Sequence, residues 1–467
     1  PEYKFKSNSD SEIIIPLYLK YGTQFIKMLK GMYSFVLYDI KNERLIAARD
    51  HIGIVSLYYL KNKETIMFSS EMKALMDIDS KNEIKVFKPG KAFINDKFYS
   101  SYSPMWKEIN YYPKNNINYD ELNMRLTKSV LSHTLSDVPI GILLSGGLDS
   151  SLIASIMCKL KKENKINNEI KTYTIGFEDS SDIIAAHKVV DYLGSDHTTY
   201  TFTKEDGLDA IREIIYYLET YDITTIRASI PMFLLTNEIK NDKENDIKVL
   251  LSGEGADELF GGYLYFHKAP NAIEFQKELV DKVNILHKYD CLRAHKACMA
   301  NTIEIRVPFL DKDFVDYIMH IDPEHKMINE KSKNIEKYIL RESFKDKYLP
   351  DEILWRQKDQ FSDAVSSKKE NWIDSLKEYA ESLISDNDFN NREKKYPINT
   401  PITKEHYLYR QIFEEYYPHK ACIETVEHNI KSIACSTERA LKWMNLSTES
   451  KLNDASGRSL VDIYNVT

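Results

Sequence analysis

The sequence predicts an α/β protein in which a β-rich N-terminal region is followed by a doubly wound parallel sheet and a mainly helical C-terminal part. From residue 121 onward, short apolar runs alternate with longer helical patterns, which is typical of parallel strands joined by crossover helices. Two of these apolar runs end in glycine-rich turns, and open parallel sheets bind ligands at the carboxyl ends of their strands. Before residue 101 the runs are short and alternate in polarity, as in β-hairpins.

The N-terminal region is expected to begin with a helix and to continue with hairpins. Residues 11–21 place apolar side chains on one face of a helix, and this pattern so near the start predicts that the chain begins partway into a domain. Alternating β-branched and aromatic residues then predict paired strands. The expected elements are a helical stretch over 24–31, strands 32–39 and 45–49, strands 58–60 and 66–69, a short helix over 70–76, and a closing segment over 89–100.

A polar stretch rich in Asn, Tyr and Pro separates two predicted domains. We expect a first domain over residues 1–105, a linker over 106–120 and a second domain over 121–467. Beyond Pro308 the pattern is mainly helical to about residue 417. In the part of the second domain before Pro308, the expected helices are 121–135, 151–162, 182–193, 205–219 and 230–240. The expected strands there are 138–144, 171–177, 197–202 and 247–251.

Composition argues against several classes of function. The 467 residues carry a net charge of −8 with dispersed Lys and Arg, which argues against a nucleic-acid partner. The five cysteines lie far apart without a disulfide or metal-binding pattern, as in reduced intracellular proteins. No apolar stretch is long enough to span a bilayer and no signal-peptide pattern opens the chain, so we expect a cytoplasmic protein without a membrane partner.

The first glycine-rich turn, residues 145–150, predicts a phosphate site. It reads Ser-Gly-Gly-Leu-Asp-Ser between an apolar strand and a helix, so backbone N–H groups and the positive end of the helix dipole can hold phosphate oxygens. The lysine that belongs to a P-loop is absent. Ser145, Ser150 and Asp149 instead suit pyrophosphate and magnesium. We therefore expect ATP to be split into AMP and pyrophosphate; the alternative is an ordinary structural turn.

A second turn, within residues 250–263, has the same layout and is crowded with acidic residues. In a parallel sheet the two turns would lie side by side, so Asp149 and Asp257 could share a magnesium ion while Ser252 and Gly253 contact the nucleotide. Carboxylates at a phosphate site are unfavourable unless a cation lies between them, which favours a metal. A structural role is the alternative, but two such turns in one sheet make it less favoured.

Together these residues resemble glutamine-hydrolysing asparagine synthetase of the B type. The motifs cover nearly the whole chain: residues 143–151, 219–229, 252–270, 306–312, 355–363, 432–436 and 454–458. Residues 49–53 and 69–75 are similar to the back half of that family's class II glutaminase, an Ntn-type β-sandwich. The family's N-terminal cysteine nucleophile has no counterpart here, and only Asp10 matches a glutamine-binding position. The chain as given is therefore not expected to hydrolyse glutamine, because an acyl-enzyme needs a nucleophile.

The resemblance also implies roles for residues of the second domain, which would be an ATP pyrophosphatase of the adenine nucleotide α-hydrolase type. Glu254 would form the aspartyl-adenylate, and Lys358 would oppose the charge on the α-phosphate. Thr224 and Arg227 would recognise aspartate, because a guanidinium can fork onto a carboxylate. Magnesium would be held by Asp149 and Asp257, and the nucleotide by Leu143, Ser145, Gly146, Gly147, Asp149, Ser150, Ile175, Gly176, Ser252 and Gly253.

The implied reaction is the ATP-dependent amidation of L-aspartate to L-asparagine through a β-aspartyl-AMP intermediate. Ammonia would come from glutamine in the intact enzyme and would be supplied as free ammonia to this chain. The implied partners are therefore these small molecules, together with a second copy in a homodimer. The alternatives are another ligase with the same ATP-pyrophosphatase loop, such as a β-lactam-forming or argininosuccinate-type synthetase, and a degenerate homologue without catalytic activity.

Overall fold

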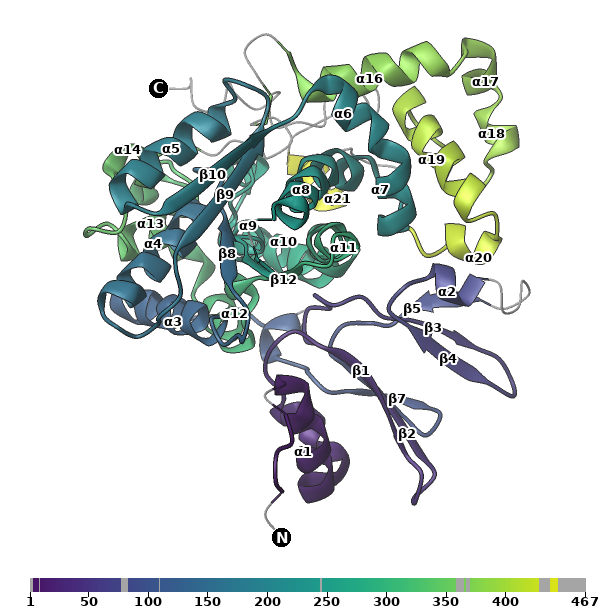
Figure 1. Cartoon of the computed structure of the whole chain (residues 1–467), viewed down its shortest axis with the longest axis horizontal. Helices are drawn as coiled ribbons and strands as arrows, with labels where there is room; N and C mark the ends of the chain where they lie inside the picture. The colour runs from purple at the N-terminus through teal and green to yellow at the C-terminus, as the bar shows by residue number, and fades with distance from the viewer. Residues whose placement is uncertain are drawn as a thin grey trace.

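The chain folds into a β-rich N-terminal region that packs against a larger α/β region (Figure 1). The computed structural model describes residues 3–7, 9–76, 83–108, 110–243, 246–357, 365–366, 370–427 and 437–443. In these ranges, no helix combines the length and the apolar character that a membrane crossing requires.

Two antiparallel sheets make up the N-terminal region. The predicted hairpins are confirmed, with Tyr38 opposite Leu45 in one and Tyr59 opposite Phe68 in the other. The first sheet has the order β1-β2-β6-β7 and the second has the order β4-β3-β5. Their strands are β1 Ser34–Asp39, β2 Arg44–Arg49, β3 Tyr58–Lys61, β4 Ile66–Ser69, β5 Ile84–Val86, β6 Lys91–Ile94 and β7 Lys97–Ser100.

The helical segments of this region are shorter than expected. The helix predicted over 11–21 is α1, Ile14–Tyr21, and it follows a 3-10 turn over Asp10–Ile13. The stretch predicted over 24–31 is a 3-10 helix, Gly22–Met28, and the helix predicted over 70–76 is reduced to α2, Lys73–Met76. Gly22 ends α1 with a positive φ of 56°, which explains why the helix does not continue.

The larger region is built on a five-stranded parallel sheet with the order β10-β9-β8-β11-β12. Its strands are β8 Ile140–Leu143, β9 Lys171–Gly176, β10 Asp196–Thr201, β11 Val249–Leu251 and β12 Glu304–Arg306. The chain runs outward from β8 in one direction through β9 and β10, and from β11 in the other direction to β12. The predicted doubly wound sheet is thus confirmed, and its topological switch point lies between β8 and β11. The short strand β12 was not predicted.

Helices cover both faces of this sheet (Figure 1). Those up to the last strand are α3 Tyr119–Ser132, α4 Leu148–Lys162, α5 Ser181–Leu193, α6 Lys204–Asp209, α7 Ile211–Leu218, α8 Ile223–Asn241, α9 Ala256–Phe260, α10 Ala272–Ile285 and α11 Asp290–Ala300. The C-terminal part is mainly helical as predicted, with α12 Lys312–Met319, α13 Tyr338–Ser343, α14 Asp351–Leu354, α16 Trp372–Leu383, α17 Asp386–Asn390, α18 Arg392–Lys395, α19 Lys404–Tyr416, α20 Lys420–Ile423 and α21 Glu438–Trp443.

Three helix boundaries differ from the prediction in ways that matter for the site. Helix α4 begins at Leu148 rather than at 151, so Asp149 lies in its first turn. The helix expected over 205–219 is divided into α6 and α7. Helix α8 begins at Ile223 rather than at 230 because the Asp222 carboxylate accepts the Thr225 N–H at 2.8 Å and caps it, and Pro231 is accommodated inside the helix.

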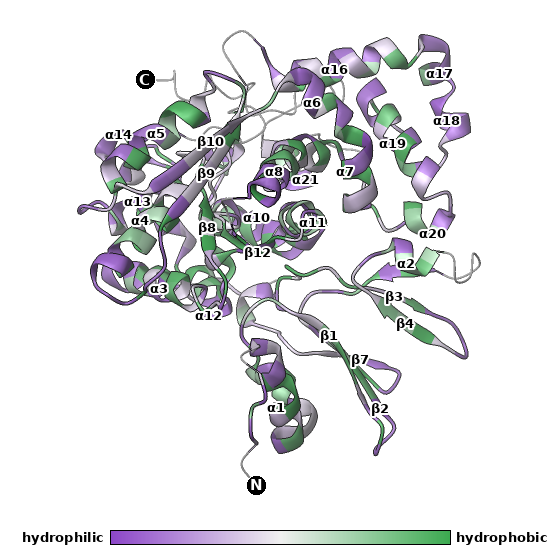
Figure 2. Cartoon of the chain, in the orientation of Figure 1, coloured by the Kyte–Doolittle hydropathy of each residue, from purple (hydrophilic) through white to green (hydrophobic). Residues whose placement is uncertain are grey.

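The two faces of the sheet belong to different hydrophobic cores. Ile142 of β8 packs with Leu152 of α4 in one core, whereas Ile175 of β9 packs with Ile226 of α8 in the other. Strand β8 is hydrophobic along its length, as expected for a strand covered on both faces (Figure 2). Burial on both sides fixes the strand, and with it the turn that follows.

Candidate active site

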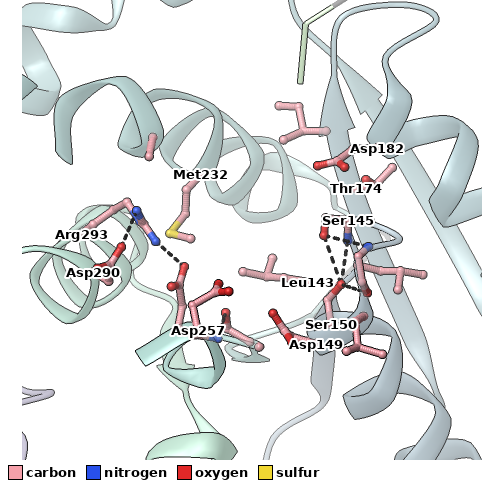
Figure 3. Close-up of a pocket in the computed structure, with 18 of the residues that line it drawn as sticks. Leu143, Ser145, Asp149, Ser150, Thr174, Asp182, Met232, Asp257, Asp290 and Arg293 are labelled. Carbon is pink, nitrogen blue, oxygen red and sulfur yellow. Dashed lines mark hydrogen bonds and ion pairs between the residues drawn. The ribbon is translucent and has the colours of Figure 1, made fainter. Parts of the chain in front are cut away.

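A cavity of about 230 Å³ opens where β8 and β11 end, at the switch point of the sheet. Figure 3 shows its walls: Leu143, Ser145, Asp149 and Ser150 come from β8 and the start of α4, and Arg293 and Asp290 face them from α11. Asp257 lies between the two groups, and Met232 of α8 reaches in from above. The cavity therefore lies where open α/β sheets bind their ligands.

The first turn, residues 145–150, is a tight loop. Gly146 has a φ of +71°, and a Cβ there would lie 2.4 Å from the backbone of Ala185 in α5, so only glycine suits the position. Within the loop, the Ser145 and Ser150 hydroxyl oxygens lie 3.2 Å apart, and the Ser145 N–H donates to Ser150 Oγ at the same distance. The start of α4 directs its free N–H groups and the positive end of its dipole into the cavity.

The second turn lies directly against the first. A Cβ added to Gly253 would lie 2.8 Å from Asp149 Cβ and from the backbone nitrogen of Ser150, which leaves no room for any other residue. The Ser252 N–H donates to the Arg306 carbonyl of β12 at 2.9 Å, so the turn is anchored on its far side as well. The sequence-based expectation that the two turns lie side by side is confirmed, because β8 and β11 are paired in parallel.

A buried lysine joins the two carboxylates that were predicted to share a metal. Lys337 Nζ lies 2.6 Å from Asp149 Oδ2 and 2.7 Å from Asp257 Oδ1. The other oxygen of Asp149, Oδ1, is buried and has no hydrogen-bond partner among the described residues. These residues also contain no cluster of three or more His, Cys, Asp or Glu side chains suited to a metal. A magnesium ion needs only one or two carboxylates plus phosphate oxygens, and the unsatisfied Asp149 oxygen fits that chemistry.

Sequence reasoning missed Lys337. It lies 80 residues after Asp257 in a segment without glycine motif, just before α13, and has a left-handed φ of 57°. The signal that could have led to it is electrostatic: two carboxylates at a phosphate site require a cation, and lysine is one.

On the opposite wall, Glu254 is fixed by α11. Arg293 Nη2 donates to Glu254 Oε1 at 2.6 Å, while Arg293 Nη1 lies 2.9 Å from Asp290 Oδ1. Burial raises the pKa of Glu254, and the Arg293 charge opposes that rise. Burial, together with Asp290 and Asp257, raises the pKa of the neighbouring Glu258 to about 8. Neither Asp290 nor Arg293 was predicted, since α11 carries no recognisable motif.

The wall beneath β9 combines apolar and polar side chains. Leu143 and Ile175 end two neighbouring strands, and Thr174 and Asp182 add polar groups beside them (Figure 3). Among the expected nucleotide contacts, Leu143, Ser145, Gly147, Asp149, Ser150, Ile175, Ser252 and Gly253 line the cavity. Gly146 and Gly176 lie behind this lining; the Gly146 carbonyl accepts a hydrogen bond from Arg356 at 3.3 Å.

The structure separates Thr224 from Arg227. Thr224 lines the cavity, but the Arg227 guanidinium binds Glu405 of α19, with its Nε 2.8 Å from Glu405 Oε1. Arg227 is only 2% exposed. The contact of Arg227 with the carboxylate of a substrate stays a prediction; in the structure its guanidinium is bound by a buried glutamate, as buried charges require.

Two further predicted residues lie away from the cavity or outside the described ranges. Asp10 is exposed in the 3-10 turn that precedes α1 and does not line the cavity. Lys358 lies outside the described residues. The residues just before it, Arg356 and Gln357, line the cavity.

Comparison with known proteins gives consistent matches along the chain. The family model described as Asparagine synthase matches residues 121–276 and 271–445, and the model described as Glutamine amidotransferase domain matches residues 1–125. Asparagine synthetase [glutamine-hydrolyzing] 2 of Oryza sativa subsp. japonica is 46% identical over 99% of this chain and 78% of its own length. The corresponding enzyme of Zea mays is 46% identical over 98% of this chain and 78% of its own, and enzyme 2 of Arabidopsis thaliana is 44% identical over 99% and 80%.

Proposed function

Because this chain belongs to the family of glutamine-hydrolysing asparagine synthetases, we propose that it is a ligase that converts L-aspartate to L-asparagine with ATP, releasing AMP and pyrophosphate. The observation that carries the proposal is the pair of touching turns at the switch point of the sheet, with Lys337 between Asp149 and Asp257. This arrangement supplies backbone N–H groups and a cation for a triphosphate, but no P-loop lysine for transfer of the terminal phosphate.

ATP would lie across the two turns. Its phosphates would be held by N–H groups of the 145–150 turn and by Lys337, while Leu143 and Ile175 would contact the adenine. Ser252 and Gly253 would close the site from the second turn. Magnesium, held by Asp149 and Asp257 and by phosphate oxygens, would neutralise the phosphates when bound.

In the first chemical step, a side-chain carboxylate oxygen of aspartate attacks the α-phosphorus, and the bond from that phosphorus to the oxygen bridging to the β-phosphorus breaks. Pyrophosphate leaves with the bonding electron pair. Lys337 faces the charge that develops on the departing group, and Lys358 has the same expected role at the α-phosphate. Thr224, on the α8 wall, would orient the aspartate.

In the second step, ammonia attacks the carbonyl carbon of the β-aspartyl adenylate, and AMP leaves. The nitrogen must lose a proton, and Glu254 would accept it; its carboxylate lines the cavity and accepts a hydrogen bond from Arg293 Nη2 at 2.6 Å. Ammonia that reaches the adenylate from within the protein would avoid protonation by solvent before it reacts.

Residues 1–105 would form the part of a glutaminase domain that docks onto the synthetase, with residues 106–120 as the linker and 121–467 as the synthetase domain. Glutamine would supply ammonia in the intact enzyme, and Asp10 would belong to the glutamine site. We further propose a cytoplasmic homodimer.

The test is a product analysis with ammonium chloride as the nitrogen source. The chain is incubated with ATP, magnesium and L-aspartate, and AMP, pyrophosphate and asparagine are quantified. We expect the three products in equal amounts, and no pyrophosphate when aspartate is withheld. Formation of ADP, or release of pyrophosphate with another carboxylic acid but not with aspartate, would contradict the proposal and favour a different ligase of this fold. A chain with no nucleotide turnover under these conditions would instead match the non-catalytic alternative.

A further inference from the structure

Helix α11 touches both the active-site cavity and the N-terminal region. Its Arg293 holds Glu254 in the cavity, and Lys296, one turn later, reaches the N-terminal strands instead. Lys296 Nζ lies 4.9 Å from the ring centre of Tyr58 in β3 and 3.6 Å from Glu71 Oε2. Helix α11 packs against α8 and α7, and in Figure 1 it lies on the side of the larger region that faces β3 and α2.

Lys296 is held by a carboxylate with an unusual backbone conformation. Glu219, which ends α7 with a φ of +58°, forms an ion pair with Lys296, and both side chains are almost fully buried. The same carboxylate accepts the backbone N–H groups of Met72 at 2.7 Å and Lys73 at 2.8 Å, at the start of α2. A glutamate in the left-handed region is strained, and such strain persists only where the surroundings hold it in place.

These contacts form a path of buried side chains and helix backbone from the N-terminal region to the cavity. It runs from the α2 backbone to Glu219, from Glu219 to Lys296, along one turn of α11 to Arg293, and from Arg293 to Glu254. Loss of Lys296 takes its buried cation from Glu219, which keeps Lys73 at 3.3 Å as a partner, and removes the ion pair that ties α11 to the end of α7. The position of α11 is therefore coupled to the docking of the N-terminal region.

We infer that Lys296 and Glu219 are positioning residues for the synthetase reaction: they fix α11 against the N-terminal region so that Arg293 holds Glu254 where ammonia reacts. This rests on the proposed function. The inference extends the proposed function, because the geometry of the synthetase cavity then depends on the docked N-terminal region, even when ammonia is supplied directly and no glutamine is present.

The test uses Lys296→Met in the full chain with ammonium chloride, and Lys277→Met as the matched control. Lys277 also pairs with a glutamate, Glu274, but on the surface of α10. We expect kcat of Lys296→Met to fall about 10- to 100-fold, as for a catalytic group displaced by part of an ångström. The KM for ATP should stay within about twofold, because Lys296 does not line the cavity. The control should match the wild type.

The pH profile separates positioning from simple loss of active protein. The groups that face Glu254 are Arg293, Asp290 and Asp257, with the thiols of Cys291 and Cys298 nearby. If Arg293 shifts away, the pKa of Glu254 rises, and the acid limb of the kcat profile moves to higher pH. A reduced active fraction would lower the curve without moving it. An unmoved profile would therefore overturn the inference, as would an unchanged kcat.

A more conservative variant tests the inference if Lys296→Met does not fold. Glu219→Asp keeps the negative charge beside Lys296 but withdraws it by one methylene from the Met72 and Lys73 N–H groups. We expect kcat to fall at least about threefold with the same shift of the acid limb. A folded Glu219→Asp with wild-type kcat and profile would overturn the inference. Absence of asparagine synthesis in the wild type would instead refute the proposed function, so the two failures are distinguishable.

Discussion

Lys337 provides the sharpest test of the phosphate site. In the substitution Lys337→Met, a side chain of similar length loses the charge that lies between Asp149 and Asp257. The two carboxylates, whose turns touch, are then left to repel one another. Both the stability of the chain and the rate of adenylate formation should therefore decrease.

The magnitudes follow from the geometry. Lys337 is buried and lies within 2.7 Å of both carboxylates, so its removal should lower the free energy of unfolding by about 3–5 kcal/mol. Added magnesium should reverse part of this loss, because it restores a cation between the carboxylates. A preorganised donor to developing charge is worth about 100- to 1000-fold in kcat. We expect a decrease of that order in the aspartate-dependent release of pyrophosphate.

The assay compares Lys337→Met with Lys345→Met in urea unfolding, with and without magnesium, and in pyrophosphate release. Lys345 lies just after α13 and pairs with Glu342 on the surface, so its loss should change neither quantity by more than about 1 kcal/mol. A Lys337→Met variant that keeps kcat within threefold of the wild type would refute the assignment of this lysine to the phosphates. Equal stability losses in the two variants would refute the electrostatic argument.

Three further predictions concern packing, substrate recognition and pH. Gly253→Ala should lower affinity for ATP at least about tenfold, measured as KM, since a Cβ 2.8 Å from Asp149 and Ser150 must push the turns apart. Arg227→Met should lower the free energy of unfolding by about 3–5 kcal/mol because Glu405 is left buried and unpaired; a variant that keeps its stability and loses only aspartate affinity would show that the guanidinium contacts substrate after all. Burial lowers the pKa of Lys326 to about 7, so between pH 7 and pH 9 the unfolded chain holds a proton there that the folded chain does not. Between pH 7 and pH 9 the free energy of unfolding should therefore rise by about 2–3 kcal/mol more in the wild type than in Lys326→Met. Curves of unfolding free energy against pH that run parallel for the two proteins would contradict this.

The sheet and its two turns could be predicted because their signals are local. The buried strands β8 and β11 are apolar runs, and each ends in glycines that only a tight turn explains. Strand β12 was not predicted because Glu304–Arg306 is short and has charged residues at both ends. The start of α8 was not predicted because its β-branched residues and Pro231 do not favour a helix, although the Asp222 cap stabilises one.

The charged half of the site could not be predicted because its partners are distant in sequence. Lys337 meets Asp149 only because the residues just before α13 fold back onto the start of α4, and Arg293 meets Glu254 only through the position of α11. Arg227 was predicted to bind the substrate for the same reason, because nothing near it in sequence shows that its guanidinium forms an ion pair with Glu405. Such pairs are set by tertiary packing rather than by motif.

The central claim is that the oxygen of aspartate attacks the α-phosphorus of ATP. The most direct measurement uses L-aspartate labelled with ¹⁸O in its side-chain carboxylate, with ammonium chloride and ATP, followed by mass spectrometry of the phosphorus products. We expect one labelled oxygen in AMP and none in pyrophosphate. Label in inorganic phosphate or pyrophosphate, with AMP unlabelled, would contradict it.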